Sequence, residues 1–557
     1  MTYPPFCDIL DVYYGREAFY IKVNAMMDVV NETTFIQDYL TACGVQDVET
    51  YLSPDKIEYD HFGMYDNLCM AAMVFTEHMV NGSKVGIVQD SDSDGSCSAA
   101  ITYLLIREFS SIEPIIYTHT GKQHGLEDLM EQIKADRLDL LIIPDAGSND
   151  VAQCMELKST GVDIIILDHH VRDVDNPYAL VVNPYGNSKP VNKSISGTGV
   201  VEKFARSLGS AQDFRDIVAI SLVSDSCSLL SHENRKYIYE GLTNPSNPFI
   251  KYALGNLCNR GICSEGVAFG IAPLGNALSR QEDEASKLLF FDALVGKIVA
   301  EDAVKAMKSV KAKQDYQVKK LMSVMEPSLD MGHKVLFGFA GAESKNYLGL
   351  VANKVCGKYG KPTFMLRELD STTWSGSMRS PIDLLQPINE SRLAKCMGHD
   401  AACGIVIKKS NLKRFAKFVD SLELEVEPSV NVAASLLPDA ITTRLAKLCA
   451  DNAILWGKDI PKPMFHVRLD CPQPYIYKNR STTAKLVYGG IDFIKFFANG
   501  ADVEALQCAN NKMVDVAVTL SLNEYNGVVK PQAIIESYDI AARDEPKPDI
   551  VWEDIFK

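Results

Sequence analysis

Residues 87–100 read IVQDSDSDGSCSAA, and they place aspartates on alternate positions, Asp90, Asp92 and Asp94, directly before Gly95. Carboxylates this close repel one another, so the pattern predicts a bound cation. The spacing matches the opening of an EF-hand calcium loop, but that loop needs a bidentate glutamate at its twelfth position, where this chain has Ile101. The apolar run before the aspartates also predicts a buried strand, whereas an EF-hand begins with a helix. Calcium is therefore the less favoured cation.

The strand before these aspartates is the first of a series. Between residues 84 and 225, short β-branched runs alternate with helical patterns, which indicates βαβ units and a mostly parallel sheet. Ligands of such α/β sheets bind at the carboxyl ends of the strands. Residues that can bind metal follow three of these runs and one helical stretch: Asp90 to Asp94, Asp145, the triplet Asp168-His169-His170, and Asp225. We expect them to meet at one edge of the sheet.

The predicted ligand set consists of carboxylates and imidazoles. Hard oxygen and nitrogen ligands suit Mn²⁺ or Mg²⁺ better than a thiolate-bound zinc site would. Two such ions about 3.5–4 Å apart can share a carboxylate and stabilise the oxygens of a phosphoryl displacement. A single aspartate after a strand is more often a helix cap or a turn residue. The recurrence of such residues at successive strand ends favours the metal centre.

Composition limits the class of protein. The chain has 557 residues, 46% of them hydrophobic and 23% charged, which is typical of a soluble protein of two to four domains. No run of about 18 apolar residues predicts a membrane span, and no secretory signal is visible. The 14 cysteines show no disulfide-type spacing, which favours a reducing cytoplasm. A net charge of −16 argues against a protein that coats nucleic acid by charge alone.

Four short motifs occur in a fixed order: DSDSDG (90–95), PDAGS (144–148), LDHHV (167–171) and LVSDS (222–226). They resemble the four motifs of the DHH phosphoesterase superfamily. Further segments are similar to the RecJ-type single-strand-specific exonucleases of that superfamily: ISGTGVVEKF (195–204), SHENR (231–235), IAPLGNALSR (271–280), YLGLVANKVCGKYGKPTFML (347–366), WSGSMRS (374–380), CMGHDAACGIVI (396–407), LWGKDIPKPMFHV (455–467) and VDVAVTLSLNEYNG (514–527). The resemblance covers about residues 45–540.

The resemblance implies a fold of class α/β. A parallel-sheet DHH domain and an α/β DHHA1 domain are joined by a long helix and followed by a β-barrel, OB-like domain. The implied boundaries are an N-terminal extension that packs on the core (1–80), the DHH domain (81–284), the connecting helix (285–330), the DHHA1 domain (331–425), the OB-like domain (440–545) and a tail (546–557). The chain departs from the family pattern at Ala146, Ser279 and Met397, and none of these departures removes a charged ligand.

Matching positions imply roles for the acidic and histidine residues. Asp92 and Asp94 resemble paired ligands, one for each ion, with Asp90 a further ligand or an acceptor behind them. Asp145 takes the position of a bridging carboxylate, and Asp225 completes the shell of the second ion.

The histidine pair takes two roles. We expect His169 to bind metal through one ring nitrogen, while a carboxylate or carbonyl fixes its tautomer through the other, with Asp168 a candidate for that support. His170 is expected to face the scissile phosphate. His170 and Asp168 are therefore the predicted catalytic residues.

Cations and hydroxyls form the predicted substrate side. Arg379 with Ser377 and Ser380 resembles the DHHA1 residues that hold a substrate phosphate, and an arginine fork matches phosphate oxygens bidentately. Arg280 and His399 are expected to reach the same substrate. In the OB-like region, Tyr475 and Tyr477 are candidates for base stacking, although core packing would explain them equally well.

The sequence therefore predicts a metal-dependent exonuclease of single-stranded DNA. Cleavage from a 5′ end to 5′-mononucleotides is what the resemblance implies. Two alternatives stay open: a DHH phosphodiesterase acting on short oligonucleotides or cyclic dinucleotides, and a non-catalytic scaffold that binds nucleic acid or a replication partner. The expected partner is single-stranded DNA, with single-strand-binding and replication or recombination proteins as further candidates. A monomer with no membrane association is the simplest expectation.

Overall fold

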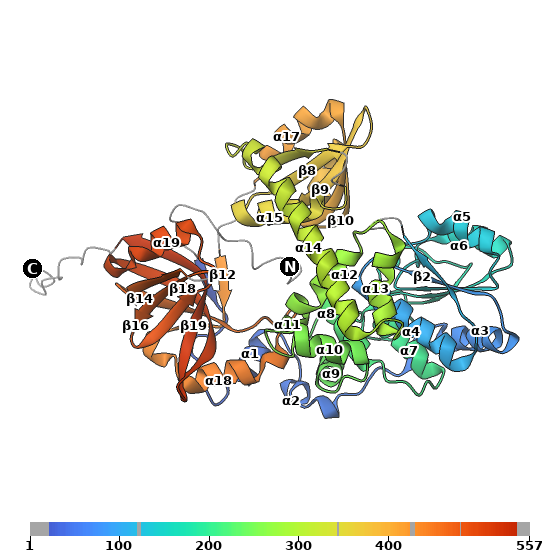
Figure 1. Ribbon diagram of the computed structural model, residues 1–557, viewed down its shortest axis with the longest axis horizontal. Helices are drawn as coiled ribbons and strands as arrows, with labels where there is room; N and C mark the ends of the chain where they lie inside the picture. The colour runs from blue at the N-terminus through green and yellow to red at the C-terminus, as the bar shows by residue number, and fades with distance from the viewer. Residues whose placement is uncertain (1–21, 120–123, 342–344, 424–428, 479–480, 543–557) are drawn as a thin grey trace, which may run out of the picture.

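The computed structural model describes residues 22–119, 124–341, 345–423, 429–478 and 481–542. These residues form three bodies, which Figure 1 shows as a large α/β domain at the right, a smaller α/β domain at the top and a β domain at the left. No helix within these ranges is long and apolar enough to cross a membrane. The predicted combination of α/β and β domains is confirmed.

The large domain is built on a five-stranded parallel sheet. Its strand order is β3-β2-β4-β5-β6. The strands are β2 (Val85–Gln89), β3 (Ile115–Thr118), β4 (Leu140–Pro144), β5 (Asp163–Leu167) and β6 (Leu180–Val182). Along β2, Ile87 packs in one hydrophobic cluster and Val88 in another, because successive residues of a strand face opposite sides of the sheet. Helices cover both faces, so β2 and β4 are buried along their whole length.

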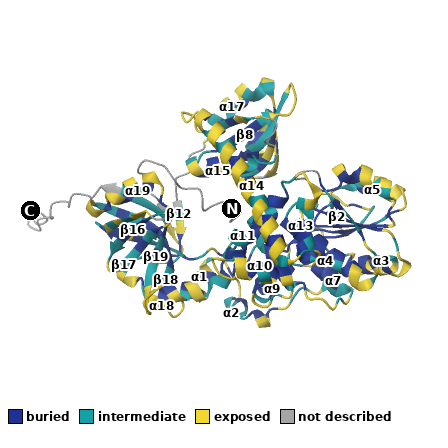
Figure 2. Cartoon of the chain, viewed as in Figure 1, coloured by how far each residue is buried: buried dark blue, intermediate teal, exposed yellow. Residues whose placement is uncertain are grey.

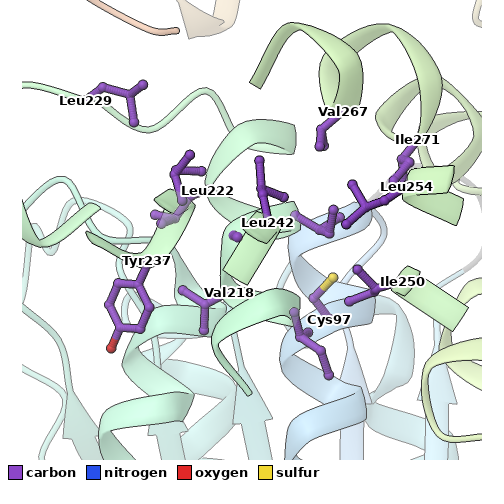
Figure 3. Packing of buried hydrophobic residues seen from close by; sticks show 14 of the residues in the cluster. Cys97, Val218, Leu222, Leu229, Tyr237, Leu242, Ile250, Leu254, Val267 and Ile271 are labelled. Atoms are coloured by element: carbon purple, nitrogen blue, oxygen red, sulfur yellow. The ribbon is translucent and has the colours of Figure 1, made fainter. Parts of the chain in front are cut away.

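Helices of the large domain flank the strands along the chain and then continue as a helical layer. They are α3 (Leu68–Asn81), α4 (Ser93–Phe109), α5 (Met130–Asp136), α6 (Val151–Ser159), α7 (Gly197–Ser207), α8 (Arg215–Ser224), α9 (His232–Thr243), α10 (Pro248–Leu257), α11 (Ser264–Gly270), α12 (Ala272–Leu278) and α13 (Glu284–Leu294). Figure 3 shows how Cys97 of α4, Val218 of α8, Tyr237 of α9 and Ile250 of α10 meet in the core. This packing fixes α4 and α8, whose ends carry the predicted ligands.

One long helix, α14 (Ala300–Met325), connects the two α/β domains. Met307 near its start belongs to the core of the large domain, and Met325 at its end belongs to the core of the smaller one. Between these two residues the helix is largely exposed, as Figure 2 shows, and 66% of the surface of Tyr316 is exposed. The expected connecting segment 285–330 thus contains most of α13, all of α14 and a short 3₁₀ turn.

The smaller α/β domain has a five-stranded mixed sheet in the order β10-β11-β9-β8-β7. The strands are β7 (Leu336–Ala340), β8 (Thr363–Glu368), β9 (Thr373–Arg379), β10 (Ala394–His399) and β11 (Ala402–Lys408). Its helices are α15 (Leu348–Tyr359), α16 (Leu385–Ser391) and α17 (Leu412–Asp420). Only β7 and β8 run parallel, and the other pairs are antiparallel.

The C-terminal domain is a seven-stranded sheet in the order β13-β14-β18-β19-β17-β16-β15. Its elements are β13 (Ala434–Leu436), α18 (Thr443–Asp451), β14 (Met464–Asp470), β15 (Gln473–Lys478), β16 (Thr482–Tyr488), β17 (Ile491–Lys495), α19 (Gly500–Gln507), β18 (Lys512–Tyr525) and β19 (Val528–Ala542). The long β18–β19 hairpin forms the centre of this sheet. The expected tail, 546–557, lies outside the described residues.

The amino-terminal part of the chain contacts both ends of the molecule. Strand β1 (Lys22–Ala25) pairs with β12 (Ser429–Val432), which precedes the C-terminal domain. Helix α1 (Phe35–Ala42) packs the Phe35 ring 5.7 Å from the ring of Phe465 in β14. After α2 (Val48–Tyr51), α3 covers the sheet of the large domain. The extension therefore links the C-terminal domain to the predicted catalytic one.

Candidate active site

The turn from β2 into α4 carries the three alternating aspartates. Asp92 is the N-cap of α4, and its Oδ1 accepts hydrogen bonds from the backbone N–H of Asp94 at 3.0 Å and of Gly95 at 3.1 Å. A side chain at Gly95 would place its Cβ 2.6 Å from the carbonyl oxygen of Asp90, so the turn requires glycine here. Helix capping and metal binding are thus compatible roles for Asp92.

Asp94 is buried and held by α7 and α8. Its carboxylate accepts from the backbone N–H of Gly197 at 2.8 Å, from that of Thr198 at 2.9 Å, and from the Ser221 hydroxyl at 2.5 Å. Burial alone would raise the pKa of Asp94, but nearby His169 and these hydrogen bonds hold it below its usual value. The segment that begins α7 therefore keeps Asp94 ionised and fixed.

His169 lies at the centre of the site. Its Nε2 is 3.2 Å from Oδ1 of Asp145, 3.6 Å from Oδ2 of Asp94 and 3.8 Å from Oδ2 of Asp225. Its Nδ1 lies 2.9 Å from the carbonyl oxygen of Ile195. A carbonyl only accepts, so Nδ1 carries the proton and leaves Nε2 as the ligand atom.

The carboxylate of Asp168 contacts the ring of His170, whereas the ring of His169 contacts Ile195. Oδ1 of Asp168 accepts from the backbone N–H of both histidines and lies 2.8 Å from Nδ1 of His170, while Oδ2 accepts from the backbone N–H of Ser148. The expectation that Asp168 fixes the tautomer of His169 is therefore wrong, because the backbone turns after β5 and sends that ring toward Ile195. Burial would lower the pKa of His170, but Asp168 raises it to about 9.

The predicted ligands meet in three overlapping groups. In each group one ligand atom per residue lies within 4.8 Å of the others: Asp90, Asp92 and Asp145; Asp94, His169 and Asp225; Asp145, His169 and His170. Asp145 occupies a left-handed backbone conformation, φ 66°, directly after β4. Asp225 caps the C-terminus of α8. The structure thus brings together all the predicted metal ligands at the carboxyl edge of the sheet.

The site has the properties of a cation site. Within the described residues, Oδ1 of Asp90 and Oδ1 of Asp145 are buried and have no hydrogen-bond partner. Burial and the neighbouring carboxylates Asp94, Asp92 and Asp90 raise the pKa of Asp145 well above its usual value. Buried carboxylate oxygens without a donor are costly unless a cation satisfies them, so the residues fit hard divalent ions.

Two histidines of the site escaped the sequence analysis. Nδ1 of His124 lies 2.5 Å from Oδ2 of Asp90, and Nε2 of His119 lies 3.6 Å from Oδ1 of the same carboxylate. Nδ1 of His119 is 2.8 Å from Asp128. His119 directly follows β3, so the rule that located the aspartates at strand ends would have found it.

The predicted substrate residues lie on two domains. Arg280 follows α12 and donates to the carbonyl of Asn276, whose side chain accepts from Ser93 at the start of α4. On β9, Ser377 and Arg379 share one face and approach Gly349 at the start of α15, where an added Cβ would lie 3.4 Å from the Ser377 hydroxyl and 3.2 Å from Nη2 of Arg379.

The other two predicted substrate residues end or follow strands of the smaller domain. Ser380 is buried in the turn after β9, where its hydroxyl accepts from the backbone N–H of Ile382 at 3.1 Å. His399 ends β10, and its side chain lies outside the described part of the chain. A role in substrate binding stays a prediction for both.

Comparisons with known proteins agree with this geometry. The model of the DHH family, N-terminal domain, matches residues 84–222, and that of the RecJ OB domain matches residues 432–537. The SPbeta prophage-derived protein YorK of Bacillus subtilis (strain 168), named as a single-strand DNA-specific exonuclease, is 27% identical over 89% of this chain and 94% of YorK. The single-stranded-DNA-specific exonuclease RecJ of Escherichia coli (strain K12) is 24% identical over 82% of this chain and 87% of RecJ.

A solved structure shares the fold. The crystal structure of RecJ in complex with Mn²⁺ from Thermus thermophilus superimposes with a TM-score of 0.72 at 19% identity, over 95% of this chain and 80% of that one. The similarity therefore extends beyond the two matched domains to the helix and the α/β domain between them. The chain thus has a DHH-family N-terminal domain at residues 84–222 and a RecJ OB domain at residues 432–537, and along most of its length it is similar in sequence and fold to single-stranded-DNA-specific exonucleases named RecJ.

Proposed function

We propose that this chain is a metal-dependent exonuclease that degrades single-stranded DNA from a 5′ end and releases 5′-mononucleotides. The observation that carries the proposal is the cluster of buried carboxylates around His169, with two oxygens that lack a donor within the described residues. Relatives over most of the chain are named for single-strand-specific exonuclease activity. The residues that would hold two Mn²⁺ or Mg²⁺ ions are Asp90, Asp92, Asp94, Asp145, His169 and Asp225.

The protein side chains orient the substrate for in-line displacement. When bound, divalent ions supply positive charge that stabilises the phosphoryl oxygens as water replaces the 3′ oxygen on phosphorus. Asp168 holds His170 through Nδ1, so the half-exposed ring presents its Nε2 edge to the scissile phosphate. From that position an imidazolium donates a hydrogen bond to a non-bridging oxygen.

The C-terminal domain offers a surface for the incoming strand. Tyr475 and Tyr477 point to the same side of β15 and keep 48% and 45% of their surface exposed. The ammonium of Lys485 lies 5.5 Å and 5.9 Å from the centres of the two rings. Aromatic rings beside a cation are the usual means of gripping single strands without sequence preference. We infer that this face guides single-stranded DNA toward the metal centre.

The cellular setting follows from the same proposal. Every cysteine within the described residues is a free thiol, which suits a reducing compartment such as the cytoplasm. An exonuclease of single strands would meet DNA coated by single-strand-binding proteins during repair, recombination or replication. We infer partners of that class, with the chain itself acting as a monomer.

End-labelled DNA tests the proposed function. Single-stranded and duplex DNA are incubated with Mn²⁺, Mg²⁺ or EDTA, and the wild type is compared with Asp145→Ala. Release of mononucleotides from the 5′ end of the single strand only, with metal and not in the variant, is the expected result. Cleavage confined to di- to pentanucleotides or cyclic dinucleotides would instead indicate a phosphodiesterase that acts on small substrates. Binding without any cleavage would favour the scaffold.

Arg379→Ala is expected to raise KM for 5′-phosphorylated single strands about 10-fold, with a smaller change in kcat. A charge-assisted hydrogen bond to phosphate contributes about 1.5–3 kcal/mol. Gly349→Ala should shift KM in the same direction by less, because its Cβ would crowd the guanidinium at 3.2 Å. Steady-state kinetics on substrates with and without the 5′ phosphate measure both effects.

The matched control is Gly255→Ala, a helical glycine of α10 with no heavy atom within 4 Å of an added Cβ. It should leave KM unchanged. Equal KM values for Arg379→Ala and the wild type on both substrates would show that Arg379 does not bind the 5′ phosphate.

A further inference from the structure

His124 reaches the metal centre from a part of the chain that the four acidic motifs do not include. It lies between β3 and α5, and its Nδ1 is 2.5 Å from Oδ2 of Asp90. Asp90 itself is buried, whereas the side chain of His124 keeps 47% of its surface exposed. The histidine therefore spans from a buried carboxylate to the surface of the site.

The position of His124 is fixed by the following residues. Oδ2 of Asp150, in the segment between β4 and α6, accepts a hydrogen bond of 2.9 Å from the backbone N–H of Leu126. The same oxygen would lie 2.5 Å from a Cβ at Gly125, which has a left-handed φ of 83°. A neighbouring strand end thus anchors the backbone directly after His124, at a position where only glycine fits.

His124 and His170 are arranged in the same way. Each ring is tied through Nδ1 to a buried aspartate, Asp90 or Asp168, and each side chain is about half exposed, 47% and 50%. Their ring centres lie 6.2 Å apart and their planes are inclined by 60°. In both, the carboxylate occupies Nδ1, so any bond to a substrate is made through Nε2.

We propose that His124 is a substrate-binding residue that holds one phosphate group of the nucleotide together with His170. Two rings at this separation can both donate to oxygens of one phosphate, since each hydrogen bond spans about 2.8 Å. This role rests on the proposed function, because His124 would help to position the nucleotide that the exonuclease releases. Asp90 then has two roles, as a metal ligand and as the support of His124.

Two substitutions separate phosphate binding from support of Asp90. The amide nitrogen of asparagine mimics Nδ1 of histidine, so His124→Asn retains the contact with Asp90 and removes the Nε2 edge. The longer His124→Gln places an amide nitrogen near the Nε2 position. His333→Gln is the control, an exposed histidine of the smaller α/β domain whose ring nitrogens lie near the carboxylates of Asp330 and Asp420.

Calorimetry provides a readout that does not depend on turnover. Mn²⁺ is titrated into metal-free protein, and thymidine 5′-monophosphate is then titrated into the Mn²⁺-loaded protein. For His124→Asn we expect nucleotide affinity to fall about 10-fold or more while Mn²⁺ affinity stays within about twofold, because one charge-assisted hydrogen bond to phosphate is lost. His124→Gln should recover part of the nucleotide affinity, and His333→Gln should match the wild type.

Two outcomes would overturn the proposal. A parallel loss of Mn²⁺ and nucleotide affinity in His124→Asn would make His124 a support of the metal centre alone. Unchanged nucleotide affinity in His124→Asn would exclude a contact between His124 and the phosphate. Failure of the proposed function has a different signature: the wild type would release no mononucleotides from single-stranded DNA, whatever the nucleotide titrations show.

Discussion

Asp145→Asn is expected to abolish hydrolysis and, at the same time, to stabilise the metal-free protein. Asp145 belongs to two of the three ligand groups, so an amide in its place should lower kcat at least about 10³-fold. Without metal, Asp145 is a buried carboxylate whose Oδ1 has no hydrogen-bond partner among the described residues. Burial and Asp94, Asp92 and Asp90 raise its pKa. A neutral side chain of the same shape removes that cost.

The stability gain has a defined pH dependence. Because the pKa of Asp145 is raised in the folded state, the ionised group destabilises the fold above the ordinary aspartate pKa of about 4. The variant should therefore unfold about 2–5 °C higher than the wild type at pH 8, and this difference should fade as the pH falls toward 4. Differential scanning calorimetry in EDTA measures it.

The control for this prediction is Asp439→Asn, an exposed aspartate of the C-terminal domain. It should change neither kcat nor the unfolding temperature. Mn²⁺ should stabilise the wild type more than Asp145→Asn. An inactive variant that is less stable than the wild type in EDTA would show that Asp145 has a structural role unrelated to a cation.

Lys203→Met is expected to reduce the free energy of unfolding by about 3–5 kcal/mol, because it leaves a buried carboxylate unpaired. Lys203 of α7 is fully buried; its ammonium forms an ion pair with Glu233 and donates to the carbonyl of Asp60 at 3.0 Å. It also lies 5.3 Å from the ring centre of Tyr59 and 5.5 Å from that of Tyr237. The segments that resemble the family at 195–204 and 231–235 thus meet in one buried ion pair.

A double-mutant cycle in urea measures this pair. Lys203→Met combined with Glu233→Gln should be more stable than Lys203→Met alone, since no buried charge is left without a partner. Lys193→Met, an exposed lysine near the ring of Tyr185, is the control and should cost less than about 0.5 kcal/mol. Additive effects of the two substitutions would mean that the pair does not contribute as a unit.

The centre of the site could be predicted from the sequence because the geometry of a parallel sheet is simple. Asp90, Asp145 and Asp168 each follow a buried run, and the carboxyl ends of such runs must meet at one edge. The DHH and RecJ resemblance supplied the order of the domains. Neither the positions of these residues at strand ends nor the order of the motifs depends on the conformation of a loop, so both can be recognised in a distant relative.

What the sequence could not predict depends on backbone atoms and loops. The partner of His169 is the carbonyl of Ile195, a group that every residue carries, so no side-chain pattern identifies it. His124 lies against Asp90 in a loop whose backbone is held by Asp150 just beyond Gly125, a contact made across two strand ends. For the same reason, Tyr475 and Tyr477 could not be distinguished from core residues until their exposure was known.

Helix α14 also sets a length scale for the proposed reaction. It passes through solvent between the core that holds Asp145 and the domain that carries Arg379, and its 26 residues span about 39 Å. Deleting one residue would turn the smaller domain by about 100° and shorten the span by about 1.5 Å, whereas inserting seven would nearly restore its orientation about 10 Å further away. In the proposed reaction, the number of residues in this helix therefore sets the distance between the metal centre and Arg379, the residue proposed to hold the 5′ phosphate.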